Sequence, residues 1–135
     1  MNIQSKRSQR LIVNRLLQDF RDDCRPSVEQ QWLRLAAAHV VGQNDLSLHL
    51  QVHSTMLGFA VRTRDWAEAV GQLVRLALVP VGHLLDRLPA GNIGRATVSA
   101  FKPMPVPPEV MELIVQARCL TLAHGVESTP GLLHR

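Results

Sequence analysis

The sequence predicts an all-α fold of about five helices, packed as antiparallel hairpins with one long loop docked across them. Apolar residues recur at intervals of three and four over most of the 135 residues, which is the period of an amphipathic helix. Apolar residues make up 46% of the chain but aromatic residues only 4%, which favours helices packed through Leu, Val and Ala. A chain of this length is most simply one domain. We place it at residues 1–125, with a disordered tail at 126–135.

Five stretches carry the helical period and are bounded by start or stop signals. They cover residues 8–24, 27–41, 45–63, 65–80 and 108–124. Ser27, with Gln30 three residues later, forms a capping-box pattern at the second start. Gly42 marks the end of that helix, and Asn44 is the expected N-cap of the next one. Residues 1–7 are expected to fray.

The fourth helix is expected to begin at a second capping-box pattern, Asp65 with Glu68. Its period predicts an inward stripe made of Trp66, Val70, Leu73 and Ala77. The outward positions would be Glu68, Gly71 and Arg75. Pro80 is expected to kink or end the helix because proline cannot donate a backbone hydrogen bond. A further short helix would then fit residues 81–88.

Residues 89–108 interrupt the helical pattern and hold five of the eight prolines. A segment this long without periodicity is usually functional, and its apolar residues predict a loop docked on the helices. Its first part, Pro89-Ala-Gly-Asn-Ile-Gly, lacks the glycine spacing of known phosphate-binding loops. We interpret it as a tight turn, with an anion-binding loop as the alternative.

Charge and cysteine usage exclude several classes of function. The formal charge of +4 is scattered, without interleaved aromatics or a basic recognition helix, so no nucleic-acid partner is expected. No stretch approaches the roughly 18 apolar residues of a membrane span, so no membrane association is expected. Cys24 and Cys119 form no CxxC motif, which favours a reducing, cytoplasmic location. We expect both to be small buried hydrophobes rather than nucleophiles.

Three of the six histidines, His39, His49 and His53, lie within fifteen residues of one another. The short connection at residues 42–45 makes its flanking helices antiparallel neighbours. Helical-wheel positions place each histidine among apolar residues, and folding the chain back about residue 43 brings the three to similar heights. The sequence therefore predicts that the three imidazoles meet inside a helical hairpin.

A buried imidazole trio suits a divalent transition metal, namely Zn, Cu or Ni, or Fe where a carboxylate joins the ligands. Asp45 and Glu68 are the nearest carboxylates by sequence, and Met56 could add a thioether for Cu(I). Gln43 and Gln72 are expected to be interior hydrogen-bond partners of the histidines. The leading hypothesis is a small metal-binding or metal-responsive protein.

Two other interpretations stay open beside the metal site. The histidines could be purely structural, in a repeat-like helical module that binds a protein partner. Trp32 and Trp66 are 34 residues apart, which is the tetratricopeptide period, and residues 64–69 resemble the opening of such a repeat. The chain could also be an enzyme with a histidine-bound iron. The oligomeric state is left open.

Several short motifs occur between residues 27 and 115. They are Ala38-His39-Val40-Val41-Gly42-Gln43, His49-Leu50-Gln51-Val52-His53, Arg64-Asp65-Trp66, Pro89-Ala90-Gly91-Asn92-Ile93-Gly94 and Phe101-Lys102-Pro103-Met104-Pro105. Together they resemble an uncharacterised bacterial family known as a domain of unknown function. Members are often encoded near heavy-metal-resistance determinants, so the resemblance implies an association with metals. It also implies that the three histidines are positions of the family pattern.

Overall fold

The computed structural model describes residues 3–22, 24 and 27–127. Helices account for most of this part of the chain, and it contains no strand. The helices are α1 (Ile3–Asp22), α2 (Val28–Gly42), α3 (Leu46–Arg62), α4 (Trp66–Leu84) and α5 (Pro108–Glu127). The all-α prediction is confirmed.

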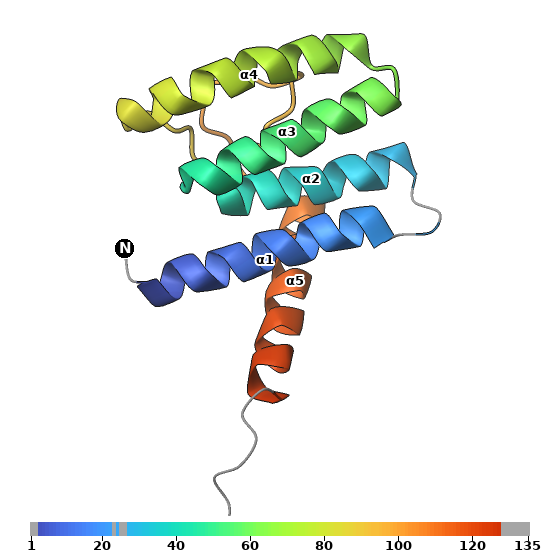
Figure 1. Cartoon of the computed structure of the whole chain (residues 1–135), viewed down its shortest axis with the longest axis vertical. Helices are drawn as coiled ribbons and strands as arrows, with labels where there is room; N and C mark the ends of the chain where they lie inside the picture. The colour runs from blue at the N-terminus through green and yellow to red at the C-terminus, as the bar shows by residue number, and fades with distance from the viewer. Residues whose placement is uncertain (1–2, 23, 25–26, 128–135) are drawn as a thin grey trace, which may run out of the picture.

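The first four helices form a stack in chain order, each antiparallel to the one before it (Figure 1). α5 crosses α1 and α2 and packs on both of them. The stack has the expected helical hairpins, whereas its likeness to tetratricopeptide repeats stays a prediction. In this arrangement α2 and α3 lie at the centre, so side chains between them are shielded from water.

The ends of the central helices follow local hydrogen bonding. Ser27 and Gln30 form the predicted capping box at the start of α2. α3 is capped by Asp45, whose carboxylate accepts a bond from the backbone N–H of Leu48 at 3.1 Å. The prediction of Asn44 as N-cap is wrong, because the helix begins one residue later than expected.

α4 continues through Pro80 to Leu84, so Pro80 does not end it and no separate helix forms over 81–88. Proline removes one hydrogen bond from a helix. Pro80 is exposed, so water can hydrate the carbonyl of Leu76, which would otherwise accept a bond from the N–H of residue 80. The helix therefore tolerates it.

The outer helices are longer than expected. α1 begins at Ile3, so residues 3–7 are helical rather than frayed. α5 ends at Glu127, three residues beyond the predicted end at 124. Most of the predicted disordered tail, from residue 128 onward, lies outside the described residues.

The hydrophobic core fills the space between α1, α2, α3 and α5. Its aromatic part lies at one end of the α2–α3 contact. There Trp32 packs edge-on against Phe59 with ring centroids 4.9 Å apart, and Phe20 packs against Phe59 at 5.4 Å. The other end of the same contact holds the histidines.

α4 turns its polar side inward, which is the opposite of the prediction. Glu68 and Arg75 are 2% and 8% exposed, whereas Trp66, Val70 and Leu73 are between 55% and 62% exposed. The prediction is wrong because the layer beneath α4 is not purely apolar. The actual layer includes the backbone of the long loop, whose N–H and C=O groups require polar partners.

The loop of residues 85–107 is docked, as predicted. Its buried residue Asn92 donates from Nδ2 to the carbonyls of Ser99 and Lys102, and its Oδ1 accepts from the N–H of Gly94. A turn occurs at residues 90–91, which confirms the tight-turn interpretation of the first part of the loop. The loop is thus tied internally before it contacts the helices.

Cys24 and Cys119 are both exposed, so the prediction that they are buried is wrong. Cys119 lies on the outer side of α5, and Cys24 lies between α1 and α2. Neither cysteine forms a disulfide. Among the described residues, no helix is long and apolar enough to cross a membrane.

Candidate metal centre

The three predicted histidines meet at one point between α2 and α3. The Nε2 atom of His39 lies 3.0 Å from that of His49 and 3.1 Å from that of His53. The Nε2 atoms of His49 and His53 are 3.2 Å apart. All three residues are buried, with 2% to 6% of their surface exposed. The predicted convergence is therefore confirmed.

The hydrogen-bond partners on the far side of two rings fix their tautomers. The Nδ1 atom of His39 lies 2.7 Å from the backbone carbonyl of Asn92, so Nδ1 carries the proton and donates it. His53 Nδ1 lies 2.7 Å from Oε1 of Gln72. Because the Gln72 amide nitrogen donates to Glu68 and to the Gly94 carbonyl, its oxygen must accept from His53. Both Nε2 atoms therefore present lone pairs.

The third ring has another histidine as its outer partner. His49 Nδ1 lies 3.1 Å from Nε2 of His83 on α4, a half-buried residue. When His49 donates through Nδ1, its Nε2 also presents a lone pair, and three lone pairs then face one another. This arrangement resembles that of many metal-bound histidines, whose second ring nitrogen donates to a carbonyl or carboxylate.

Glu68 connects α4 to the loop behind the cluster. Its carboxylate accepts from Gln72, from the backbone N–H of Ala96 at 2.9 Å, and from Arg95 at 3.2 Å. The Arg95 guanidinium in turn lies over the Trp32 ring, 4.1 Å from its centroid. The orientation of Gln72, and through it the tautomer of His53, therefore depends on this network.

Two glycines allow the loop to approach so closely. Gly94 has φ +78°, and a Cβ placed there would lie 2.6 Å from a carbon of the His39 ring. At Gly71 on α4, a Cβ would lie 2.2 Å from Cβ of Ala96. Any side chain at either position would push the loop away from the cluster. The loop backbone is thus part of the wall that orients His39.

Burial keeps the imidazoles uncharged at neutral pH. It is the largest cause that lowers the pKa of His39 well below the usual value, and the neighbouring His53 and His49 lower it further. Burial lowers the pKa of His49 to about 3 and that of His53 to about 4. The Arg75 charge lowers the pKa of all three. Neutral imidazole is the form that binds metals.

The spacing of the nitrogens suits a single ion. Ligand atoms around a tetrahedral ion with bonds of about 2.0–2.1 Å lie about 3.3 Å apart. The three Nε2 distances of 3.0–3.2 Å are within a few tenths of that value. Among the described residues, these three form a group whose side chains could hold a metal ion together.

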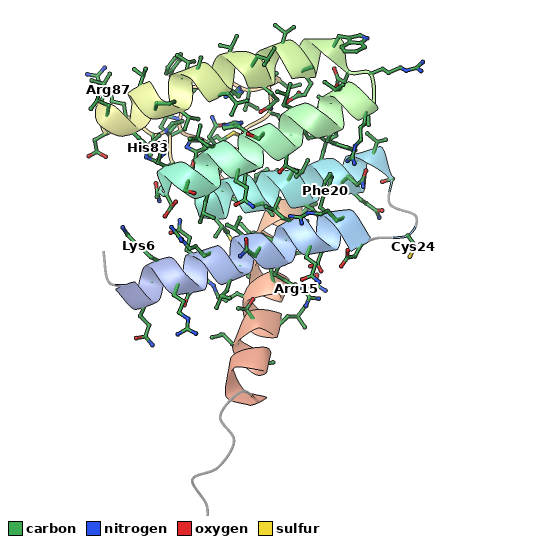
Figure 2. All side chains as sticks on the ribbon, viewed as in Figure 1. Lys6, Arg15, Phe20, Cys24, His83 and Arg87 are labelled. Atoms are coloured by element: carbon green, nitrogen blue, oxygen red, sulfur yellow. The ribbon has the colours of Figure 1, made fainter. Side chains whose placement is uncertain are left out.

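The cluster borders a pocket of about 50 Å³. Its wall includes the three histidines, Arg75, and residues of the loop and the end of α4. Figure 2 labels His83 and Arg87 at that end of α4, and Arg87 also lines the pocket. A fourth ligand position on a bound ion would be reached from this side.

The other side chains considered as ligands are engaged elsewhere. Asp45 caps α3 and lies 3.6 Å from Arg10, and Glu68 is held by the loop. Met56 is fully buried in the hydrophobic core. Gln72 contacts the His53 ring as predicted. Gln43 lines the pocket and donates its backbone N–H to the carbonyl of His39, and no bond from its side chain to an imidazole is seen among the described residues. The described site therefore consists of three imidazoles without a carboxylate.

Sequence reasoning missed His83 and the loop residues. The turn after α3 folds the chain back in the same way as the turn at residues 42–45. Positions 49 and 80 then lie at the same height, and His83 lies one helical turn beyond position 80. No pattern indicated the carbonyl of Asn92, because a backbone contact leaves no mark on residue type.

A family model described as a protein of unknown function (DUF3703) matches residues 7–114. The match includes the three clustered histidines and each of their outer partners. Neither a curated protein nor a solved structure matches the chain. Because the match covers most of the sequence, the chain belongs to the DUF3703 family.

Proposed function

We propose that this protein binds one divalent transition-metal ion through the Nε2 atoms of His39, His49 and His53. One observation carries the proposal: three buried ring nitrogens face one another at 3.0–3.2 Å while their outer nitrogens are occupied by other partners. A metal ion would accept all three lone pairs at once.

A purely structural role accounts for this geometry less well. The Nε2 atoms of His39 and His53 are both acceptors and lie 3.1 Å apart, so no proton joins them when both rings are neutral. Only His49 could donate to them from this side, through a single Nε2 proton, so at least one of the two buried acceptors would lack a donor of its own, at a cost of roughly 1–3 kcal/mol. A structural cluster would be expected to alternate donors with acceptors. Two facing acceptors are instead what a cation site requires.

The ligand set favours Zn, Cu or Ni over non-haem iron, because iron sites of this kind use a carboxylate beside the imidazoles. The cluster also joins separate parts of the fold, since its outer partners come from α4 and from the loop. Metal binding would therefore strengthen the attachment of the loop, which supports a metal-responsive role. The unpaired cysteines support the cytoplasmic location expected from the sequence.

Metal uptake by variants tests the proposal. Metal-free protein should take up one Zn²⁺ or Co²⁺ per chain, measured by calorimetry and by the visible absorption of bound Co²⁺. At a free metal concentration 100 times Kd, the free energy of unfolding should rise by about 2.7 kcal/mol, which would be seen as a rise in Tm. His49→Gln and His53→Gln should each lose this uptake.

Gln51→Ala is the matched control, because Gln51 is exposed on α3 between the two histidines. It should bind metal like the natural protein. Circular dichroism of the glutamine variants would separate loss of the ligand from loss of the fold. Unchanged stoichiometric uptake by folded His49→Gln and His53→Gln proteins would refute the proposal.

Protein interaction is a second candidate function, supported by the outer face of α4. This face is apolar and exposed along its length: Trp66, Val70, Leu73, Ala77, Val81 and Leu84. The spacing is close to the heptad seam of a coiled coil. The charged residues of α4, Glu68 and Arg75, are both buried, so the outer face carries no formal charge.

We propose that a second copy of the chain packs along this face. An uncharged seam can pair with itself without repulsion between like charges. Light scattering should give a dimer for the natural protein and a monomer for Leu73→Glu. Leu122→Glu, at an exposed site on α5, should leave the dimer intact. A natural protein that stays monomeric at high concentration would contradict this.

A further inference from the structure

The pocket beside the histidine cluster has the size and charge of a binding site for a small anion. Resting on the metal site proposed above, we propose that the bound ion carries an exogenous monoanion of three or four heavy atoms, of the class of azide, formate or bicarbonate. Arg75 supplies the second positive charge that holds the anion.

The charge balance of the site calls for an anion. Three neutral imidazoles leave the full double charge of a divalent ion uncompensated. Among the described residues, the pocket wall contains Arg75 and Arg87 and no carboxylate. The buried carboxylate of Glu68 is held by Arg95 and by the backbone of Ala96, and it does not line the pocket. The Glu68 charge still acts on Arg75 and His53, but Arg95 is paired with it, so an incoming anion would meet a net positive potential.

Arg75 is fixed where its charge acts on all three imidazoles. Its guanidinium NH2 donates to the backbone carbonyls of Arg95 and Val98. These bonds anchor the side chain to the loop, and the residue is 8% exposed. The same residue also lines the pocket. Its charge is therefore positioned at the site before any ligand arrives.

The walls of the pocket favour some anions over others. The pocket is small, about 50 Å³, and the three histidines line it, so a small anion could reach a bound ion from it. Much of the remaining wall is apolar: Leu78, Val79, Leu88 and Phe101. Such walls strengthen the attraction between charges, and they favour monoanions over sulfate or phosphate because a singly charged ion costs less to dehydrate.

The test uses the full chain loaded with Co²⁺, with azide, formate and sulfate as probes. Azide and formate should each shift the visible spectrum of bound Co²⁺ saturably, and sulfate should have little effect. Arg75→Met should still bind Co²⁺, while its affinity for azide falls by about tenfold or more. Arg75→Lys keeps the charge and should recover part of that affinity. Arg87→Met should have a smaller effect, because Arg87 lies exposed at the mouth.

The outcomes separate this inference from the metal site itself. If Co²⁺ binds with 1:1 stoichiometry and neither azide nor formate changes its spectrum, the anion site is refuted and the metal site stands. If sulfate binds as well as azide, the proposed preference for monoanions is wrong. If Arg75→Met binds azide normally, the role of Arg75 is refuted. If no Co²⁺ binds, the proposed function and this inference both fail.

Discussion

The α2–α3 contact holds a cluster of rings at each of its two ends, and the two clusters differ in chemistry. At one end the centroids of Trp32 and Phe59 are 4.9 Å apart. At the other end the centroids of the three imidazoles are 4.7–4.9 Å apart. The ring spacing is nearly the same, yet only the first cluster is apolar. The first stabilises the fold by removing apolar surface from water.

The histidine end cannot be explained by packing alone. Three aliphatic side chains would fill a similar space without burying ring nitrogens. The chain instead uses Gln72, Asn92 and His83 to orient each imidazole. An arrangement that sacrifices stability for orientation is typical of a functional site. The two ends should therefore respond separately to pH and to mutation.

Acid should destabilise the metal-free protein through the histidine end. Folding lowers the pKa of His49 to about 3 and that of His53 to about 4, and lowers that of His39 as well. Below about pH 6.5 the unfolded chain therefore binds more protons than the folded one. The free energy of unfolding should be constant above that pH with respect to these groups. It should then fall by up to about 4 kcal/mol per pH unit until the folded pKa values are approached.

Urea unfolding of the metal-free protein at pH 7.5 and pH 5.5 measures this effect. The His53→Gln variant should show a weaker pH dependence, because one of the three groups is gone. Equal urea midpoints at the two pH values would show that the imidazoles are not held neutral by the fold.

Truncation at the aromatic end should cost stability without affecting the metal. Phe59→Ala removes a buried ring that contacts both Trp32 and Phe20, so unfolding should become easier by about 3–5 kcal/mol. Its pH dependence should match that of the natural protein. Metal affinity, measured by calorimetry under conditions where the variant is folded, should change little. A large loss of affinity would mean that the two ends are coupled.

Removing an outer partner at the histidine end should weaken metal binding more than it destabilises the fold. Gln72→Met leaves Nδ1 of His53 without its acceptor, and the loss of such a partner typically weakens metal binding by about 10–100-fold. Competition with a chelator of known affinity would measure the change. Gln51→Met, on the exposed side of α3, is the control. Equal affinities for the two variants would argue against an orienting role for Gln72.

The sequence predicted the helices and the meeting of the three histidines because both depend on helical period and on one short turn. The orientation of α4 was not predictable in the same way. Trp66 and Leu73 share an apolar stripe, but they face water. Glu68 and Arg75 are buried because their partners are backbone groups of residues 95, 96 and 98. Amphipathicity indicates that a helix has two faces, and the adjoining layer decides which face is buried.

Contacts made through the backbone also explain why some residues of the site were not predicted. Gly94 is required by its positive φ and by its contact with His39, and neither property could be derived from spacing. The position of His83 could have been derived from the α3–α4 hairpin, since it lies one helical turn beyond the position level with His49. Of the outer partners of the imidazoles, Gln72 was predicted from the sequence, whereas His83 and the carbonyl of Asn92 became visible only with the fold.

X-ray absorption at the metal edge of the zinc-loaded protein would identify the atoms that bind the ion. The spectrum should show one zinc per chain with three imidazole nitrogens at about 2.0–2.1 Å and one light atom completing the shell. His39→Ala should remove this signal from the folded protein. A shell dominated by sulfur or by carboxylate oxygen, or a protein that retains no zinc after gel filtration, would contradict this prediction.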